Sequence, residues 1–332
     1  MKIQSLSVVV PTKNKCVNSC KFCVSRTHTN PYCDRISSVV SSFKNIPRMV
    51  DLMYEPLNYS TVNKEGISKQ YEADMVANAL LEEYSIEYKD YYNRLQFARD
   101  NGCNVIVLTG TGEPIQNINF LDFFSEVNEK LQTPFKSIEI QTTGVMLNDE
   151  NLSRLRKNGV TTISFSISNI FDNKRNLEVI GCHKKLEFDV FEIIELVKKH
   201  DFNLRLSLNL INDYDEDYTV EEVIDRCEEL GADQVTFRKL YKSDLNNEID
   251  QWIEENASES FYDELVKYVK DNGKYLGVLP FGPSIYDIKE MSVVVDDDCM
   301  GEKVETDTYK YLILRENAKL YSKWETKASL VF

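Results

Sequence analysis

A unit of helix, glycine and strand recurs along this sequence, and it constrains the fold more than any other feature. In each copy a helical pattern ends in glycine, and a run of β-branched and apolar residues follows within a few positions. The copies place glycine and strand at Gly102 and Val105–Leu108, Gly159 and Val160–Ser166, and Gly231 and Gln234–Phe237. Glycine readily adopts the left-handed conformation that closes a helix. The repeated alternation predicts an α/β fold whose strands run parallel.

Three further strands complete the series, at Ser5–Val10, Ser137–Gln141 and Leu204–Leu210. The segments between the strands have helical periodicity, as in the apolar faces Leu121, Phe124, Val127 and Leu131, and Val220, Val223, Ile224, Cys227 and Leu230. Six strands that begin near residues 5, 105, 137, 160, 204 and 233 suit a partial (β/α)6 barrel. We expect this barrel to occupy residues 1–241.

Two segments depart from the pattern. Residues 37–101 or thereabouts are longer than one crossover helix requires, so we expect an insertion with two helices, marked by Val76, Leu80 and Tyr84 and by Tyr92, Leu95 and Ala98. Residues 242–332 turn to short strands after residue 275, including Ser292–Val295, Tyr309–Leu314 and Lys319–Trp324. The last two strands predict a hairpin around Glu316 and Asn317. This tail is expected to be a small C-terminal α/β appendage.

Charge and hydropathy exclude several classes of function. The 332 residues include 39 Lys and Arg against 54 Asp and Glu, a formal net charge of −15. Such a balance repels phosphate backbones and argues against nucleic acid as a partner. The sequence has no run of eighteen apolar residues and no signal-peptide pattern, so neither a membrane span nor secretion is expected. Eight cysteines in so long a chain do not indicate a disulfide scaffold. We therefore expect a cytoplasmic protein.

Three of the cysteines, Cys16, Cys20 and Cys23, lie within eight residues directly after the first strand. Thiolate ligands favour iron–sulfur clusters or zinc. A [4Fe–4S] cluster normally takes four cysteines, so three would leave one iron open to another ligand. A zinc site with Cys33 or His28 as the fourth ligand is the alternative reading.

The spacing Cx3CxxC, with Phe22 just before the last cysteine, resembles the signature of the radical S-adenosylmethionine (SAM) superfamily. The resemblance implies one [4Fe–4S] cluster held by the three cysteines, with SAM on the open iron. It also implies reductive cleavage of SAM to a 5′-deoxyadenosyl radical. A flavodoxin- or ferredoxin-type protein would be the electron donor.

A second motif follows the second strand, where the loop Thr109, Gly110, Thr111, Gly112, Glu113 and Pro114 resembles the glycine-rich "GGEP" motif of that superfamily. Ligands of parallel barrels bind at the carboxyl ends of the strands. By resemblance, polar residues at later strand ends bind SAM and substrate, namely Thr142, Ser166, Ser168, Ser207, Asn209 and Arg238. From the residues alone, Thr142 and Ser168 serve equally well as helix caps, and Arg238 as a surface ion-pair partner.

Residues 1–241 are similar to the branch of the superfamily that contains the GTP-cyclising enzymes of molybdenum-cofactor synthesis, and the tail resembles a shortened auxiliary ("twitch") domain. Cys299 is the only cysteine of the tail, so we expect one cluster and no auxiliary one. The GTP-cyclising activity is not expected either, because the chain lacks the Arg-Gly-Gly terminus of those enzymes.

The expected function is therefore hydrogen abstraction from a small molecule, a nucleotide or a peptide by the deoxyadenosyl radical. A non-catalytic interaction protein that binds zinc or SAM is the alternative, and metal analysis separates the two.

Overall fold

The computed structural model describes residues 2–12, 16–27, 88–243, 245–278, 282–296, 308–324 and 326–332. Most of the expected insertion lies outside the described residues, including the helix expected at Val76–Tyr84, and so do His28, Cys33 and Cys299. The second expected helix of the insertion is present, because residues 88–100 are helical and bury Tyr91, Leu95 and Ala98 completely.

All six expected strands are present and pair in parallel in sequence order. They are β1 (Lys2–Val9), β2 (Val105–Thr109), β3 (Ser137–Thr142), β4 (Thr162–Ile167), β5 (Asn203–Asn209) and β6 (Gln234–Arg238). The sheet is mixed and not closed in the part of the chain that is described, with β11 at one edge and β7 at the other. The expected partial barrel is thereby confirmed.

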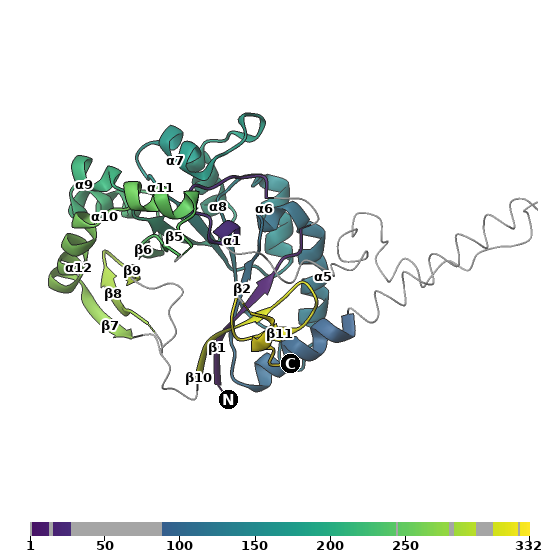
Figure 1. Cartoon of the computed structure of the whole chain (residues 1–332). Coiled ribbons are helices and arrows are strands. Elements are labelled where there is room, and N and C mark those ends of the chain that lie inside the picture. The colour runs from purple at the N-terminus through teal and green to yellow at the C-terminus, as the bar shows by residue number, and fades with distance from the viewer. Residues whose placement is uncertain are drawn as a thin grey trace, which may run out of the picture.

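Helices connect the strands and surround the outside of the sheet (Figure 1). The longer ones are α5 (Ile118–Glu129), α6 (Asp149–Lys157), α7 (Asn173–Ile180), α8 (Val190–Lys199), α10 (Val220–Glu229), α11 (Glu248–Asn256) and α12 (Ser260–Asn272). The short ones are α1 (Val24–Thr27), α9 (Asp213–Asp217) and the 3-10 turns η4 (Pro114–Asn117), η5 (Lys184–Leu186) and η6 (Lys327–Ser329). Side-chain caps start most of the long helices, as Asn148 does for α6 and Thr219 for α10.

Alternation along β3, β4, β5 and β6 separates an apolar face from a polar one. On β5, Leu204, Leu206 and Leu208 are fully buried in the core that also contains the helix side chains. Arg205 and Asn209 therefore lie on the opposite face, inside the barrel. This polar inner face is what the sheet offers to a ligand.

An ion pair between β3 and β5 lies inside the barrel, before the carboxyl ends of these strands. Arg205 Nη1 is 2.6 Å from Glu139 Oε2, and the side-chain amide of Gln141 donates to the other oxygen of Glu139 at 3.4 Å. Glu139 is buried, so its charge requires these partners. Gln141, two residues nearer the end of β3, connects the pair to the cavity described below.

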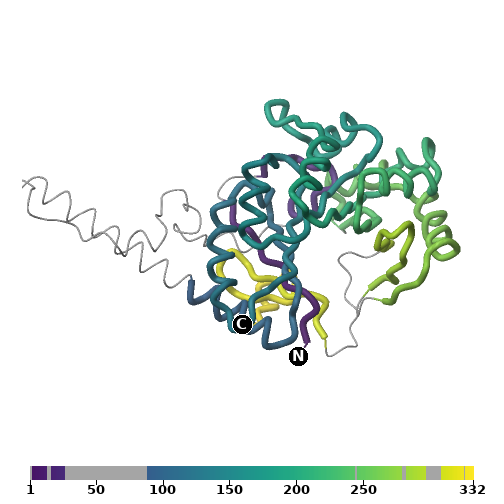
Figure 2. Tube along the Cα trace, turned by 180° about the vertical axis from the view of Figure 1, so that it is seen from behind, coloured from purple at the N-terminus to yellow at the C-terminus, as the bar shows by residue number. Residues whose placement is uncertain are grey.

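The strands of the tail join the same sheet at both of its ends. They are β7 (Lys274–Val278), β8 (Ser284–Ile288), β9 (Met291–Asp296), β10 (Thr308–Leu314) and β11 (Leu320–Tyr321). β9 pairs in parallel with β6, while β10 pairs in parallel with β1, so the two ends of the chain lie side by side (Figure 2). The hairpin expected around Glu316 and Asn317 is confirmed, since β10 and β11 are antiparallel. The sheet continues across the domain boundary expected at residue 241, which stays a prediction.

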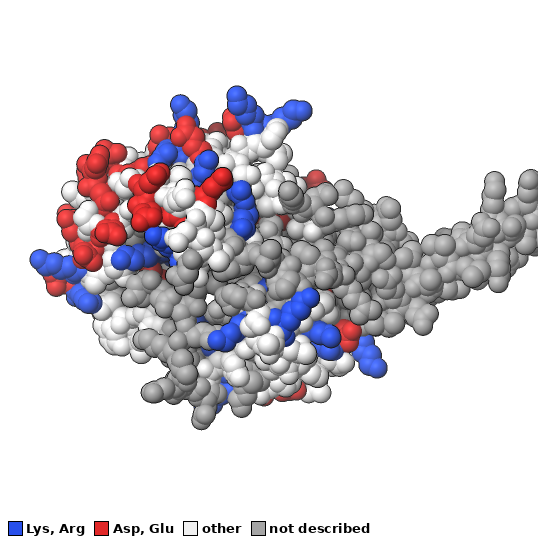
Figure 3. Space-filling model, in the orientation of Figure 1, with Lys and Arg blue, Asp and Glu red and all other residues white. Residues whose placement is uncertain are grey.

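The negative charge is unevenly distributed. Figure 3 shows acidic side chains gathered on the side of the molecule where α9, α10, α11 and α12 lie. Asp215, Glu216, Asp217 and Glu221 are exposed there. None of the described helices is long and apolar enough to cross a membrane.

Candidate active site

The loop that carries the three cysteines leaves the end of β1 and rests on the end of α7. The main-chain N–H of Ser19 donates to the carbonyls of Ile180 and Gly181 at 3.1 and 3.2 Å, and that of Lys21 donates to Val179 at 2.9 Å. Gly181 caps α7 in the left-handed conformation, at φ 59°. A Cβ there would lie 2.6 Å from the carbonyl oxygen of Ser19, so glycine allows the loop to approach this closely.

Burial and neighbouring negative charge raise the pKa of the thiols of Cys16 and Cys20. For Cys20, burial is the largest cause of the raised pKa, and negative charge on Cys23 and Cys16 raises the pKa further. Among the described residues, no three His, Cys, Asp or Glu side chains are gathered closely enough to hold a single metal ion. A four-iron cluster does not require such convergence, because each cysteine binds a different iron.

The glycine-rich loop after β2 packs against the end of β1. A Cβ on Gly110 would come within 3.0 Å of the carbonyl oxygen of Val10, so the two chain segments touch through their backbones. Gln116 also joins the two loops, because its side-chain oxygen accepts from the main-chain N–H of Val17 at 3.1 Å and of Glu113 at 3.2 Å. The cysteine loop and the glycine-rich loop are thus held as one unit.

Glu113 is the most perturbed acid of this unit. Its Oε2 accepts from the main-chain N–H and the hydroxyl of Thr143 at 3.2 and 3.1 Å, and Asn18 donates to the same hydroxyl at 2.8 Å. Burial raises the pKa of Glu113 from 4.5 to about 7, and hydrogen bonds from Thr142 and Thr143 oppose the rise. Its second oxygen, Oε1, is buried without a hydrogen-bond partner among the described residues.

Three strand ends, those of β4, β5 and β6, contribute further polar groups. The side-chain amide of Asn209 donates to the hydroxyl of Ser166 at 3.2 Å, and Arg238 lies directly beside Asn209 in the sheet. Arg238 Nε is buried and has no hydrogen-bond partner in the described part of the chain. An unpaired guanidinium nitrogen is costly to bury, which favours a ligand at this position.

These elements line one open cavity of about 270 Å³. Most of the residues expected from the sequence line it, namely Cys16, Cys20, Phe22, Cys23, Thr109, Gly110, Thr111, Gly112, Glu113, Pro114, Thr142, Ser166, Asn209 and Arg238. Two expected residues do not. Ser207 is two residues deeper on the inner face of β5 than Asn209, and Ser168 is fully buried, with its main-chain N–H donating to Asn176 at 2.9 Å.

Sequence reasoning missed several lining residues, including Asn18, Ser25, Gln141, Lys239, Leu240 and Tyr241. Two of these had a positional signal, because Asn18 lies between two cysteines and Ser25 lies two residues after the third. Lys239 to Tyr241 continue directly from Arg238, so the whole end of β6 belongs to the cavity.

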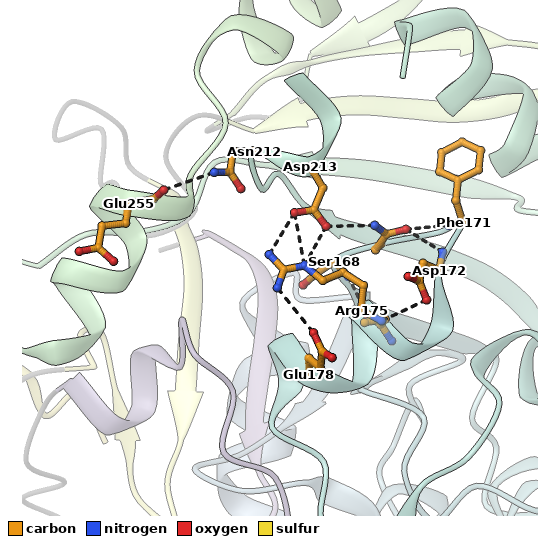
Figure 4. A network of polar contacts seen from close by, with 10 residues as sticks. Ser168, Phe171, Asp172, Arg175, Glu178, Asn212, Asp213 and Glu255 are labelled. Atoms are coloured by element: carbon orange, nitrogen blue, oxygen red, sulfur yellow. Dashed lines mark hydrogen bonds and ion pairs between the residues drawn. The ribbon is translucent and has the colours of Figure 1, made fainter. Parts of the chain in front are cut away.

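A polar network on the βα loops holds α7 in place (Figure 4). Arg175 of α7 binds Asp213 through Nε at 2.9 Å and through Nη2 at 3.0 Å. The side-chain amide of Asn169 donates to Asp213 at 3.1 Å. Because α7 carries the cysteine loop at its other end, this network fixes the loop from the far side of the helix.

The aromatic residue of the cysteine motif contacts the segment that follows the barrel. The rings of Phe22 and Trp252 are 6.4 Å apart between centroids, and Trp252 belongs to α11. The segment after residue 241 thus helps to place a wall of the cavity.

The donor set fits a [4Fe–4S] cluster and SAM. Three cysteines that line the cavity match the softness of iron in such clusters. The cavity also has three buried atoms without a partner among the described residues, which are the oxygens Asn18 Oδ1 and Glu113 Oε1 and the donor Arg238 Nε. An amino acid with an amine and a carboxylate has the complementary groups.

Comparison with known proteins agrees with this geometry. The family model of the Radical SAM superfamily matches residues 10–227, more than half of the chain. The chain therefore belongs to this superfamily. Enzymes of the superfamily bind a [4Fe–4S] cluster and SAM and cleave SAM by radical chemistry.

Solved structures show the same fold. The crystal structure of SuiB from Streptococcus suis bound to SAM has a TM-score of 0.53 at 14% identity, covering 97% of this chain and 60% of SuiB. The structure of anSMEcpe with bound AdoMet and the Cp18Cys peptide has a TM-score of 0.51 at 11% identity, covering 98% of this chain and 75% of that one. This chain spans less than two thirds of the length of SuiB. No curated protein matches the sequence.

Proposed function

We propose that Cys16, Cys20 and Cys23 hold the [4Fe–4S] cluster and that the rest of the cavity holds SAM and the reacting part of a substrate. The observation that carries the proposal is the convergence of three thiols, a glycine-rich backbone and three polar strand ends on one cavity. When bound, the cluster supplies the electron that cleaves SAM to a 5′-deoxyadenosyl radical, which abstracts hydrogen from the substrate.

The residues of the chain would orient and shield these groups. Exposed backbone at Gly110 and Gly112 lets a ligand approach without a side chain in the way. Glu113 Oε1 and Asn18 Oδ1 can accept hydrogen bonds from an amine, whereas Arg238 can donate to a carboxylate or to the substrate. Phe22, held by Trp252, offers an apolar ring that excludes water.

We also propose that the substrate is a peptide or a small molecule, and that peptides should be tested first. Support comes from two proteins of the same fold, since SuiB has been solved with its precursor peptide SuiA and anSMEcpe with the Cp18Cys peptide. A flavodoxin- or ferredoxin-type donor would supply the electron.

The test is anaerobic reconstitution of the full chain with iron and sulfide, followed by reduction in the presence of SAM. We expect about four irons per chain, the number in one cluster, and formation of 5′-deoxyadenosine. Alanine at Cys16, Cys20 or Cys23 should abolish both. Cys182→Ala is the matched control, because Cys182 is also only partly buried but does not line the cavity.

Zinc at one atom per chain with little iron or sulfide would refute the assignment and favour the zinc-binding alternative. A fully loaded cluster that yields no 5′-deoxyadenosine with any reductant would contradict the proposed use of SAM while leaving the cluster ligands in place.

A further inference from the structure

Ser25 connects the cysteine loop to the glycine-rich loop. It lies in the single turn of α1, two residues after the last cysteine. Its hydroxyl oxygen is 3.1 Å from the sulfur of Cys23, and its hydroxyl donates to the main-chain carbonyl of Thr111 at 3.3 Å. All three residues line the cavity.

Binding of a cluster would change which atom donates the hydrogen bond between Cys23 and Ser25. As a thiol, Cys23 can donate to the oxygen of Ser25 while the serine hydroxyl donates to Thr111. Iron binds the thiolate, which has no proton to give and can only accept. The hydroxyl proton of Ser25 is then the one proton in this three-atom chain, and it has two acceptors, the sulfur of Cys23 and the oxygen of Thr111.

We propose that Ser25 is a positioning residue that donates a hydrogen bond to the Cys23 thiolate of the loaded cluster and thereby raises the reduction potential of the cluster. This inference rests on the proposed function, because it requires Cys23 to be an iron ligand. Ser25 acts only through Cys23 and need not touch SAM or the substrate.

The physical reason is that reduction adds negative charge to the cluster and its sulfur ligands. A hydrogen-bond donor at a ligand sulfur stabilises the reduced form more than the oxidised form, so hydrogen bonds to sulfur are one of the determinants of the potential. A donor to a charged acceptor is also stronger than one between neutral groups. The sulfur therefore competes well with the neutral carbonyl of Thr111 for the proton.

The experiment is a redox titration of the reconstituted full chain, followed by EPR in the absence of SAM. Ser25→Ala removes the donor, while Ser25→Thr keeps a hydroxyl at the same position. Ser19→Ala is the matched control, because it makes the same change in the same loop at an exposed residue whose side chain has no recorded contact with a cysteine in the described structure.

In Ser25→Ala, we expect the ratio of reduced to oxidised cluster at a fixed potential to fall about tenfold, which is a downward shift of about 59 mV for one electron. Ser25→Thr and Ser19→Ala should titrate like the wild type. Pulsed EPR in D2O should show exchangeable deuterons near the reduced cluster, one of which is lost in Ser25→Ala and kept in Ser25→Thr.

An unchanged potential together with an unchanged deuteron signal in Ser25→Ala would overturn the inference. Poor loading of that variant does not hide the answer, because both readouts report only on the clusters that form. A wild-type protein that assembles no cluster would instead refute the proposed function, so the two failures are distinguishable.

Discussion

Gly181→Ala should damage the proposed iron site without any change to a cysteine. Gly181 has φ 59°, and an alanine in this left-handed conformation should lower the free energy of unfolding by about 1 kcal/mol. The added Cβ would also lie 2.6 Å from the carbonyl oxygen of Ser19 and 2.8 Å from its carbonyl carbon. Because these are backbone atoms, the whole cysteine loop must shift, at a further cost of about 1–3 kcal/mol.

The chain provides a matched control in Gly231→Ala. Gly231 also has a left-handed φ, of 71°, but the nearest atom to an added Cβ is Cε of Lys198 at 3.4 Å. A flexible lysine side chain can move, so this variant should lose only about 1 kcal/mol of stability, from the left-handed backbone conformation. The two variants therefore separate backbone strain from displacement of the loop.

Two measurements check the prediction. Urea unfolding should show Gly181→Ala to be less stable than Gly231→Ala by about 1–3 kcal/mol, and reconstitution should load clearly less iron into Gly181→Ala alone. Equal stability and equal iron content in the two variants would show that the end of α7 does not support the cysteine loop.

Three further predictions follow from the contacts of the site. In the metal-free protein, the raised pKa of Glu113 means that the folded state favours the protonated carboxyl. The free energy of unfolding should therefore fall by about 3 kcal/mol as the pH rises from 4.5 to about 7. Urea unfolding of Glu113→Gln over the same pH range should not show this fall. Asp213→Asn weakens the charged contact with Arg175 and should cost about 1–2 kcal/mol in thermal or urea unfolding, and an unchanged midpoint would contradict a supporting role. Trp252→Ala removes the ring contact of Phe22, worth about 1 kcal/mol, so calorimetry should show about fivefold weaker SAM binding if the ring forms a wall of the site.

The sequence was sufficient to place the six barrel strands because each has a local signal. Gly102, Gly159 and Gly231 all have positive φ, as a glycine that ends a helix requires, and the strands begin within a few residues of them. The cysteine and glycine-rich loops were also predictable, since both follow strands whose carboxyl ends meet at one edge of the sheet.

The rest depends on contacts between distant residues. No local sequence pattern predicts that β9 pairs with β6 and β10 with β1, because strand propensity does not specify the partner strand. Ser207 alternates correctly with Asn209 but lies too deep on β5 to reach the cavity, and depth along a strand follows from register. Ser25 could not be predicted, because a serine beside a cysteine motif has no distinctive pattern and its contact with the sulfur of Cys23 is visible only in the structure.

The position of β10 beside β1 affects how the chain is made. Ile3 of β1 pairs with Tyr309 of β10, so more than three hundred residues must leave the ribosome before that edge of the first strand is covered. Contacts this distant in sequence slow folding, and an uncovered edge strand invites association with other chains. Nascent chains that stop before residue 308 should therefore depend on chaperones, even though their cysteine motif is already complete.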